Sequence, residues 1–194
     1  MGSFINPFIK ECGYDAPGHF DFRTPGITSI SCDPHKYGLG PKGVSTLLFR
    51  NPTWRSYQFF ACSKWNGGFY ATTTIAGSRP GNVIAATWAV MMKLGYEGYR
   101  KNAQIVLDAT YNIRKHIKLN VPEVKCATHD ASCVVTLVET GNPGCINPLA
   151  LKDVLKSRNW LLSPTQFPLG CHFSMTLAAA SEWKKFNADL KQSV

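Results

Sequence analysis

Hydrophobic and polar positions in the first third of the chain predict strands joined by loops. Alternating and β-branched residues predict strands at Thr28 to Cys32 and Val44 to Phe49, with a glycine-rich loop between them. A third strand is expected over Tyr57 to Cys62, followed by a turn at Asn66 to Gly68. The first 26 residues are rich in Gly, Pro and aromatic residues and predict a short helix followed by loop.

From Asn82 the pattern changes to the period of a helix. Val83 to Leu94 is apolar on nearly every face, as expected of a buried helix, and Gly95 ends it. In a second helix the apolar face repeats every three or four residues: Tyr99, Ala103, Val106, Thr110, Ile113 and Ile117. The other faces carry side chains that we interpret as solvated: Arg100, Lys101, Gln104, Asp108, Arg114, Lys115 and Lys118.

After Val121 the pattern is typical of a small α+β unit. The expected elements are a strand at Cys133 to Glu139, a turn at Gly141 to Gly144, a helix from Asn147 and Pro148 to Ser157, strands at Trp160 to Leu162 and Gly170 to Ser174, and a final helix with an apolar stripe of Ala179, Trp183, Phe186 and Leu190. We therefore predict one domain boundary, which divides the chain into residues 1–120 and 121–194.

Composition and charge narrow the function classes. The 194 residues are 44% hydrophobic and 17% charged, which is typical of a globular chain, and no apolar run is long enough for a membrane segment. The net charge is 21 − 12 = +9, but the basic residues are scattered and form no run longer than a pair. We therefore expect no nucleic-acid partner, and a basic module that binds nucleic acid or an anionic membrane is the weaker alternative.

The seven cysteines indicate a reducing compartment. Their number is odd, their spacing is irregular, and they form neither a Cys-x-x-Cys pair nor a zinc-finger pattern. We interpret them as reduced thiols and expect no metal site. The first residues do not have the pattern of a signal peptide, so a compartment facing the cytosol is expected.

The loop Asp33 to Gly43 carries the candidate chemistry. It contains Gly38-x-Gly40-x-x-Gly43, but a strand follows rather than a helix, which excludes a dinucleotide fingerprint. The His35-Lys36 pair on a glycine-rich loop that leaves a strand suggests a lysine that reacts with an aldehyde, as pyridoxal phosphate enzymes require. From residue types and spacing alone, a solvated turn remains the alternative.

Two stretches resemble a known enzyme family. Ser29-Ile-Ser-Cys-Asp33-Pro-His35-Lys36-Tyr37-Gly38, followed by Pro41-Lys42-Gly43, resembles the Schiff-base loop of the sphingosine-1-phosphate lyases, in the group II decarboxylase branch of the fold-type I pyridoxal phosphate enzymes. Tyr57-Gln-Phe-Phe60, Trp65-x-Gly67-Gly68-x-Tyr70-Ala71 and Thr74-Ile-Ala-Gly77-Ser78-Arg79-Pro80-Gly81 resemble the lyases specifically. The resemblance extends from Phe20 to the final helix.

The resemblance implies a fold and a reaction. The fold would be α/β: residues 1–120 would form the C-terminal part of a fold-type I large domain, and residues 121–194 a small α+β domain. With pyridoxal 5'-phosphate as cofactor, the enzyme would cleave a phosphorylated long-chain base to a fatty aldehyde and phosphoethanolamine. The family also implies a homodimer.

The resemblance also implies roles for particular residues. Lys36 would hold the cofactor as a Schiff base and help to move protons, and His35 would contact the cofactor or relay protons. Lys42 would lie near the substrate phosphate, so the catalytic set is Lys36, His35 and Lys42. Ser78 and Arg79 would reach a phosphate across the subunit interface, which makes Lys36, His35, Ser78 and Arg79 the cofactor-binding set. Tyr70 is a further residue that could lie near the site.

Members of this family are longer than 194 residues, and we expect the chain to be a fragment. The carboxylate that pairs with the pyridine nitrogen, the side chain stacked on the ring and the loop around the cofactor phosphate would lie upstream of Met1. The expected location is the cytoplasm or the cytosolic face of the endoplasmic reticulum, without the anchor of eukaryotic relatives. Two alternatives stay open: an amino-acid decarboxylase and a catalytically silent truncated remnant.

Overall fold

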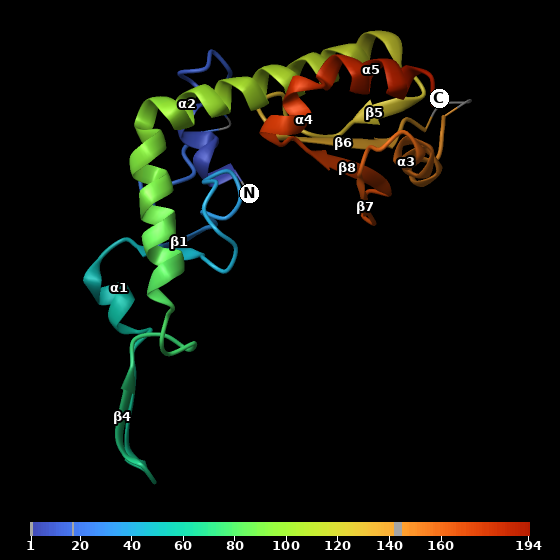
Figure 1. Ribbon diagram of the computed structural model, residues 1–194. Helices are drawn as coiled ribbons and strands as arrows, with labels where there is room; N and C mark the ends of the chain where they lie inside the picture. Colours follow the sequence, from blue (N-terminus) through green and yellow to red (C-terminus); the bar gives the residue numbers. More distant parts are fainter. Residues whose placement is uncertain (1, 17, 142–144) are drawn as a thin grey trace. The chain divides into compact units, whose positions relative to one another are not determined.

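The computed structural model describes residues 2–16, 18–141 and 145–194, and it divides into two compact units. The first unit spans residues 18–95; the second combines residues 2–16 with Tyr96–Val194 (Figure 1). Residues 142–144 of the turn expected at Gly141 to Gly144 lie outside the described residues. The domain boundary near residue 120 stays a prediction, while the two compact units of the described chain divide after Gly95.

The first unit contains two antiparallel hairpins and the first half of a long helix. Its elements are β1 (Ser29–Cys32), β2 (Thr46–Phe49), α1 (Pro52–Ser56), β3 (Phe60–Trp65), β4 (Gly68–Thr72) and the start of α2 (Gly81–Asn120). β1 pairs with β2, so that Ser29 lies opposite Phe49 and Cys32 opposite Thr46. β3 pairs with β4 around the Asn66–Gly67 turn, and Figure 1 shows this hairpin as a narrow ribbon.

The strand predictions for the first unit are confirmed for β1 and β2. For β3 the predicted bounds are wrong. The third strand begins at Phe60 rather than Tyr57 because a short helix, α1, precedes it. Asn51 caps that helix by accepting a hydrogen bond from the Trp54 amide at 3.0 Å, and Pro52 occupies the first turn. Asn51-Pro52 therefore begins a helix here. This signal was not used in the sequence prediction because the residues on both sides have the pattern of strands.

α2 is interrupted at Gly95, as the sequence predicts. This glycine has φ 57° and ψ −170°, which separates two helical segments. The apolar first segment is not buried, contrary to the prediction: Thr87 is its buried residue, whereas Trp88 is 63% and Met92 65% exposed. The described residues cover little of this segment, which is apolar on nearly every face.

Replacement of Gly95 should destabilise the chain. Its combination of positive φ and extended ψ is almost restricted to glycine, so we expect Gly95→Ala to lower the free energy of unfolding by roughly 1–3 kcal/mol. Urea unfolding followed by circular dichroism measures the change. Gly81→Ala is the matched control, because Gly81 is exposed and a Cβ there has open space; an equal loss in both variants would contradict this account.

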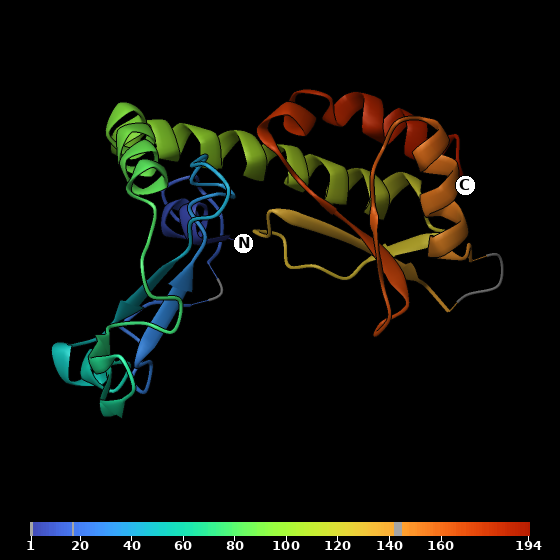
Figure 2. The same ribbon diagram turned by 60° about the horizontal axis from the view of Figure 1, so that its bottom comes forward.

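The second unit is a four-stranded antiparallel sheet packed with helices. The strand order is β5-β6-β8-β7, and Figure 2 shows α5 and the second half of α2 over the sheet. Its elements are η1 (Gly2–Phe4), η2 (Asn6–Phe8), β5 (Val124–Cys126), β6 (Val134–Glu139), α3 (Pro148–Ser157), β7 (Ser163–Thr165), β8 (Gly170–Ser174), α4 (Leu177–Ser181) and α5 (Trp183–Lys191). Its hydrophobic core includes Leu137, Leu155 and Phe186.

Several sequence predictions for the second unit are confirmed. All six residues of the predicted apolar face of α2, from Tyr99 to Ile117, are buried. α3 begins at Pro148, and the Asn147 side chain accepts a hydrogen bond from the Leu149 amide at 2.9 Å. The predicted strand at Gly170 to Ser174 has the bounds of β8.

Three secondary-structure elements of the second unit differ from the prediction. The strand expected at Trp160 to Leu162 begins at Ser163 instead, because the Trp160 amide donates to the Leu155 carbonyl at 3.0 Å in the turn that ends α3. The Trp160 ring is buried and packs on Phe173 and Phe186. The final helix divides into α4 and α5 at Glu182. β5 has no counterpart among the predicted strands.

Arg114 is buried, although the helical pattern placed it on a solvated face. Its side chain donates to the backbone carbonyls of Asp130 at 2.8 Å, Ser132 at 2.6 Å and Val134 at 2.7 Å. Burial lowers the pKa of its guanidinium. Arg114 therefore connects α2 to the segment between β5 and β6 and to the first residue of β6 by charge-assisted hydrogen bonds.

Stability should fall at alkaline pH because Cys171 is buried as a thiol. Burial raises the pKa of Cys171 from 9.0 to about 11. Below the pKa of the unfolded chain, the buried thiol is neutral and the fold keeps its full stability. As the pH rises through the folded pKa this stability is lost, so the free energy of unfolding should fall by roughly 2 kcal/mol between about pH 9 and 11. Chemical unfolding across this range checks the slope. Cys171→Ala should flatten it; an unchanged slope would contradict the assignment.

Candidate active site

The loop between β1 and β2 holds the two residues of the predicted site that lie next to each other. The paired strands bring its ends together, with Cys32 opposite Thr46. A turn begins at Asp33, whose carbonyl accepts the Lys36 amide at 3.1 Å. Gly40 closes the turn by donating its amide to the Pro34 carbonyl at 2.9 Å. The loop is therefore an ordered backbone turn rather than a loose connection.

The Lys36 amine is accessible and has an acidic partner. Its Nζ lies 2.7 Å from Asp33 Oδ2, and its side chain is 37% exposed. Ser45 donates to the other carboxylate oxygen of Asp33 at 2.8 Å. Hydrogen bonds from Lys36 and then Ser45 lower the pKa of Asp33, so this carboxylate is charged at neutral pH. The ion pair therefore holds the partly exposed Lys36 side chain beside Asp33.

His35 is anchored to the returning end of the loop. Its Nδ1 lies 2.5 Å from the Val44 carbonyl, an arrangement in which the ring nitrogen donates. This bond fixes the ring orientation and leaves Nε2 for a second partner. His35 thus joins the start of the loop to its end and keeps the neighbouring Lys36 in place.

Gly40 lets the loop approach α2 closely. A Cβ on Gly40 would lie 3.1 Å from Thr87 Oγ1 and 3.3 Å from the Pro34 carbonyl, closer than most real contacts. Lys42 follows in the exposed turn at 41–43, beyond this contact. The structure therefore places Lys42 on the same loop as Lys36 but in a separate turn.

Arg79 lines a pocket beside the end of the loop. This pocket, of about 890 Å³, is lined by three arginines, Arg50, Arg55 and Arg79, and includes Ser45 and Thr87. Arg79 donates to the Gly77 carbonyl and to Thr74 Oγ1, so its guanidinium is held by its own segment. Three guanidinium groups around one space favour an anionic group.

Ser78 and Tyr70 line a second pocket, of about 620 Å³, between the β3–β4 hairpin and the segment that follows it. Ser78 is exposed and Tyr70 is 41% exposed. Within the first unit, the predicted residues therefore form three groups rather than one constellation: His35 with Lys36, Arg79 beside the loop end, and Ser78 with Tyr70.

The sequence reasoning missed the parts played by Asp33 and Ser45. Asp33 is part of the motif, but it was not assigned a role from the sequence. It lies three residues before Lys36, and this i, i+3 spacing could have indicated the ion pair. Ser45 is twelve residues from Asp33, and only the hairpin brings the two side chains together. The arginines at positions 50 and 55 were also not assigned.

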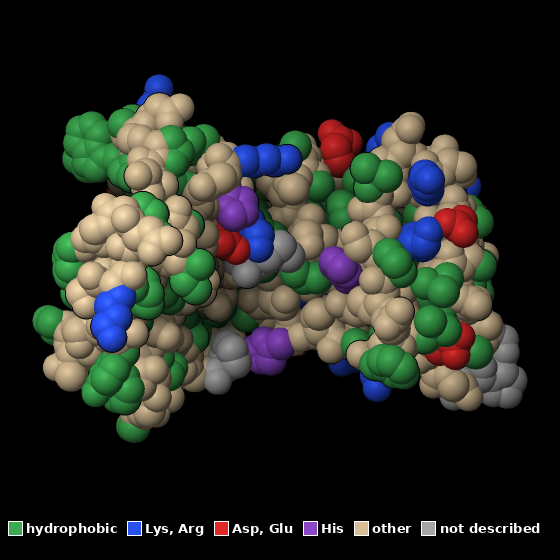
Figure 3. Space-filling model, turned by 90° about the horizontal axis from the view of Figure 1, so that it is seen from below, with side chains coloured by type: hydrophobic (Ala, Val, Ile, Leu, Met, Phe, Trp, Pro, Cys, Tyr) green, Lys and Arg blue, Asp and Glu red, His purple; other side chains and the backbone are tan. Residues whose placement is uncertain are grey.

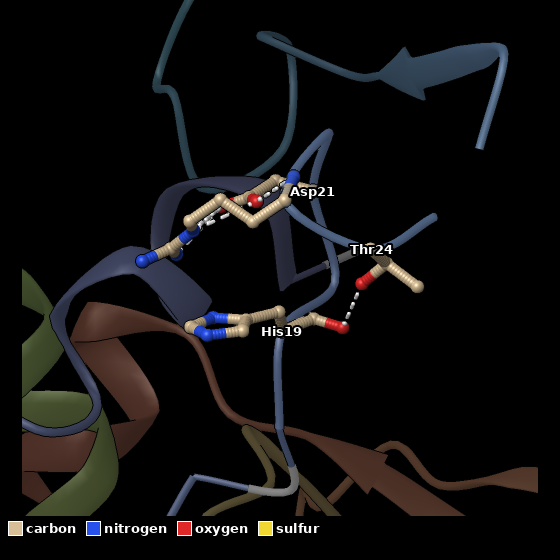
Figure 4. A network of polar contacts seen from close by, with 4 residues as sticks. His19, Asp21 and Thr24 are labelled. Carbon is tan, nitrogen blue, oxygen red and sulfur yellow. Dashed lines mark hydrogen bonds and ion pairs between the residues drawn. The ribbon is translucent and has the colours of Figure 1, made fainter. Parts of the chain in front are cut away.

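The segment before β1 is ordered by local polar contacts (Figure 4). Thr24 Oγ1 donates to the His19 carbonyl at 2.8 Å, and the Arg23 guanidinium donates to both carboxylate oxygens of Asp21. Arg50, which follows β2, donates to the carbonyls of Ile27 at 2.6 Å and Thr24 at 2.8 Å. His19 therefore takes part in this network through its backbone carbonyl.

A family model matches most of the chain. It is the pyridoxal-dependent decarboxylase conserved domain, and it matches residues 2–137, which include Lys36 and its loop. The chain belongs to this family. The resemblance on which the sequence analysis relied is confirmed, and the cofactor of the family is pyridoxal phosphate.

Individual relatives and solved structures agree with the family. The chain is 39% identical over 194 residues to a sphingosine-1-phosphate lyase of Arabidopsis thaliana, covering 100% of this chain and 35% of that one. The solved sphingosine-1-phosphate lyase of Burkholderia pseudomallei is 30% identical with a TM-score of 0.88, covering 100% and 43%. A glutamate decarboxylase of Lactobacillus brevis, 20% identical with a TM-score of 0.76 over 99% and 44%, shows the same fold.

These matches confirm the α/β fold class of fold-type I pyridoxal phosphate enzymes. The chain spans about a third of the length of the curated relatives it matches, 35% in the Arabidopsis protein. The described residues include an accessible lysine on an ordered loop and an arginine-lined pocket. The Lys36 amine suits the aldehyde of pyridoxal phosphate, so the described residues fit that end of the cofactor. Lys36 does not line the arginine pocket, which is a separate candidate site for an anionic group.

Some features of the described residues bear on other kinds of site. No helix among residues 2–16, 18–141 and 145–194 is long and apolar enough to cross a membrane. Within the same residues, no group of three or more His, Cys, Asp or Glu side chains could hold a metal ion. All seven cysteines are thiols rather than parts of disulfide bonds. Figure 3 shows Lys and Arg side chains as separate groups on the face seen there.

Proposed function

We propose that the chain is the cofactor-lysine portion of a pyridoxal phosphate-dependent lyase that cleaves sphingosine or sphinganine 1-phosphate to a long-chain aldehyde and phosphoethanolamine. The observation that carries the proposal is the ordered His35-Lys36 loop in a chain of the decarboxylase family. The lyase is favoured within the family because the Arabidopsis lyase is 39% identical over the whole chain.

When bound, pyridoxal phosphate supplies an electron sink for breaking the bond between C2 and C3 of the substrate. Lys36 provides the amine that holds the cofactor aldehyde and a site at which protons are moved at Nζ. His35 is fixed by the Val44 carbonyl next to Lys36, and its Nε2 would be available to contact the cofactor. Asp33 positions Lys36 in its ammonium form at 2.7 Å, so Lys36 would have to lose a proton before its amine could react with the cofactor aldehyde.

Phosphate groups would be bound by the cationic and hydroxyl side chains outside the turn. Lys42 is exposed on the same loop and would pair with the substrate phosphate. Ser78 and Arg79 are exposed on the segment between β4 and α2 and would bind a phosphate in the site of a second subunit.

A homodimer would explain the apolar surface of the β3–β4 hairpin. Phe60 is 56% and Phe69 74% exposed, and the Ser78–Arg79 segment follows directly. Aromatic side chains of this kind are typical of the buried part of an interface. Placed against a second copy, the hairpin would be covered and would carry Ser78 and Arg79 to the partner's phosphate site.

The cysteines, which are thiols rather than disulfides, support a location in the cytoplasm or at the cytosolic face of the endoplasmic reticulum.

Product analysis of the natural protein that contains this chain tests the proposal. Sphinganine 1-phosphate and a set of amino acids, including glutamate and tyrosine, are supplied separately with pyridoxal phosphate. Release of a long-chain aldehyde with an equal amount of phosphoethanolamine supports the lyase. Carbon dioxide from an amino acid, without aldehyde from the phosphorylated base, would show instead an amino-acid decarboxylase, the alternative that the family name itself favours.

A further inference from the structure

A pocket in the second unit has no part in the proposed reaction. Its volume is about 410 Å³, which is within the range of small-molecule sites. It lies where the last turns of α2 meet β5 and the segment that follows. The side chains that matter for its chemistry are Arg114, Lys118, Lys125, Cys126, Thr128 and Asp130.

The pocket has an excess of positive charge. Arg114, Lys118 and Lys125 face one carboxylate, Asp130, so the formal charge of the lining is 3 − 1 = +2. Arg114 is 5% exposed, and its hydrogen-bond acceptors are Thr128 Oγ1 and three backbone carbonyls, all without formal charge. Among the described residues, no ion pair includes either lysine. An anion entering the pocket would thus meet a lining with net positive charge, in which Asp130 offsets one of the three cations.

Cys126 places a nucleophile in this cationic lining. It is the last residue of β5, is half-buried, and its Sγ lies 3.3 Å from Thr128 Oγ1. The Arg114 guanidinium is close enough to interact with the Cys126 side chain. Burial lowers the pKa of Arg114, and the interaction with Cys126 raises it in part. Thiols in cationic, partly exposed surroundings are those that react with disulfides.

We propose that this pocket binds the anionic half of a small disulfide, of the chemical class of glutathione disulfide, and that Cys126 forms a mixed disulfide with it. The Cys126 thiolate attacks one sulfur of the small disulfide, whose S–S bond breaks as the new S–S bond forms. The other half leaves as a thiolate and takes up a proton from water. Cys126 is oxidised, the leaving half is reduced, and the carboxylates of the retained half pair with Lys118 and Lys125.

Competition between disulfides of opposite charge tests the proposal without any variant. The folded chain is treated with glutathione disulfide or with cystamine, a cationic disulfide, and peptide mapping measures the rate at each cysteine. Cys145, which is exposed and is not part of the pocket lining, is the internal control for the net positive charge of the chain. We expect the rate ratio of glutathione disulfide to cystamine to be at least about tenfold higher at Cys126 than at Cys145. In denaturant the two ratios should become equal.

Charge reversal in the pocket gives the second test. Lys118→Glu with Lys125→Glu should reduce the preference of Cys126 for glutathione disulfide to that of Cys145 or below. Lys115→Glu is the matched control, because Lys115 is exposed on the same helix but does not line the pocket, and it should leave the preference unchanged. Equal ratios at Cys126 and Cys145 in the folded chain would overturn the proposal. So would an unchanged preference in the double variant.

Discussion

Replacement of Lys36 by Ala should abolish aldehyde release from a phosphorylated long-chain base. We expect the rate to fall by at least about 10³-fold, because the variant removes the amine that would hold the cofactor. The turn that begins at Asp33 has no other amine, since Lys42 lies in a separate turn of the loop. Turnover is measured with sphinganine 1-phosphate and pyridoxal phosphate in excess, in the natural protein that contains the chain. Lys101→Ala, an exposed change on α2, is the matched control and should retain full activity. Retention of more than about a tenth of the activity in Lys36→Ala would exclude Lys36 as the cofactor lysine.

Replacement of Arg114 by Met should unfold the second unit or bring it close to unfolding. The variant leaves the carbonyls of Asp130, Ser132 and Val134 without their charged donor. An unsatisfied buried polar group costs about 1–3 kcal/mol, so the loss should be roughly 3 kcal/mol or more, a large part of the stability of a domain. Urea unfolding measured by circular dichroism gives the difference.

Arg100 provides the control for that loss. It forms an i, i+3 pair with Glu97 at 3.0 Å, and the Glu97 side chain is 75% exposed. Such a surface pair contributes about 0–1 kcal/mol, so Arg100→Met should have little effect. A small loss in Arg114→Met, comparable to that in Arg100→Met, would show that the carbonyls find other donors and that Arg114 is not a structural residue.

The helical periodicity of the second unit was the most informative sequence signal. The six positions from Tyr99 to Ile117 are buried as their spacing predicts, since one face of an amphipathic helix covers a sheet. Arg114 escaped this reasoning because a charged residue on the polar side of a helix is usually solvated. Its burial depends on carbonyls that lie 16 to 20 residues along the chain, a contact that no local pattern contains.

The first unit shows the opposite case. The segment Val83 to Leu94 has the composition of a buried helix, yet Trp88 and Met92 are largely exposed among the described residues. Periodicity predicts which faces are apolar, but burial also requires a neighbouring surface. The displaced start of β3 has a local cause, because the Asn51 cap and Pro52 begin a helix within a stretch that reads as loop before a strand.

The candidate site was predictable where it is local in sequence. His35 and Lys36 follow from a short motif, and the structure holds both on one ordered turn. The arginine-lined pocket was not predictable, because Arg50 and Arg55 come from around α1 and Arg79 from the segment before α2. Which phosphate each of these cations binds depends on tertiary and subunit contacts, so the roles of Lys42, Ser78 and Arg79 remain proposals.

The central claim is that Lys36 holds the cofactor. The most direct measurement is to add pyridoxal phosphate to the natural protein that contains this chain, reduce with borohydride, and locate the label by peptide mapping at low cofactor excess. The account predicts that the label lies predominantly on the peptide containing Lys36 and is lost from it in Lys36→Ala. A label distributed over exposed lysines such as Lys64 and Lys101, with Lys36 no more reactive than they are, would contradict the account.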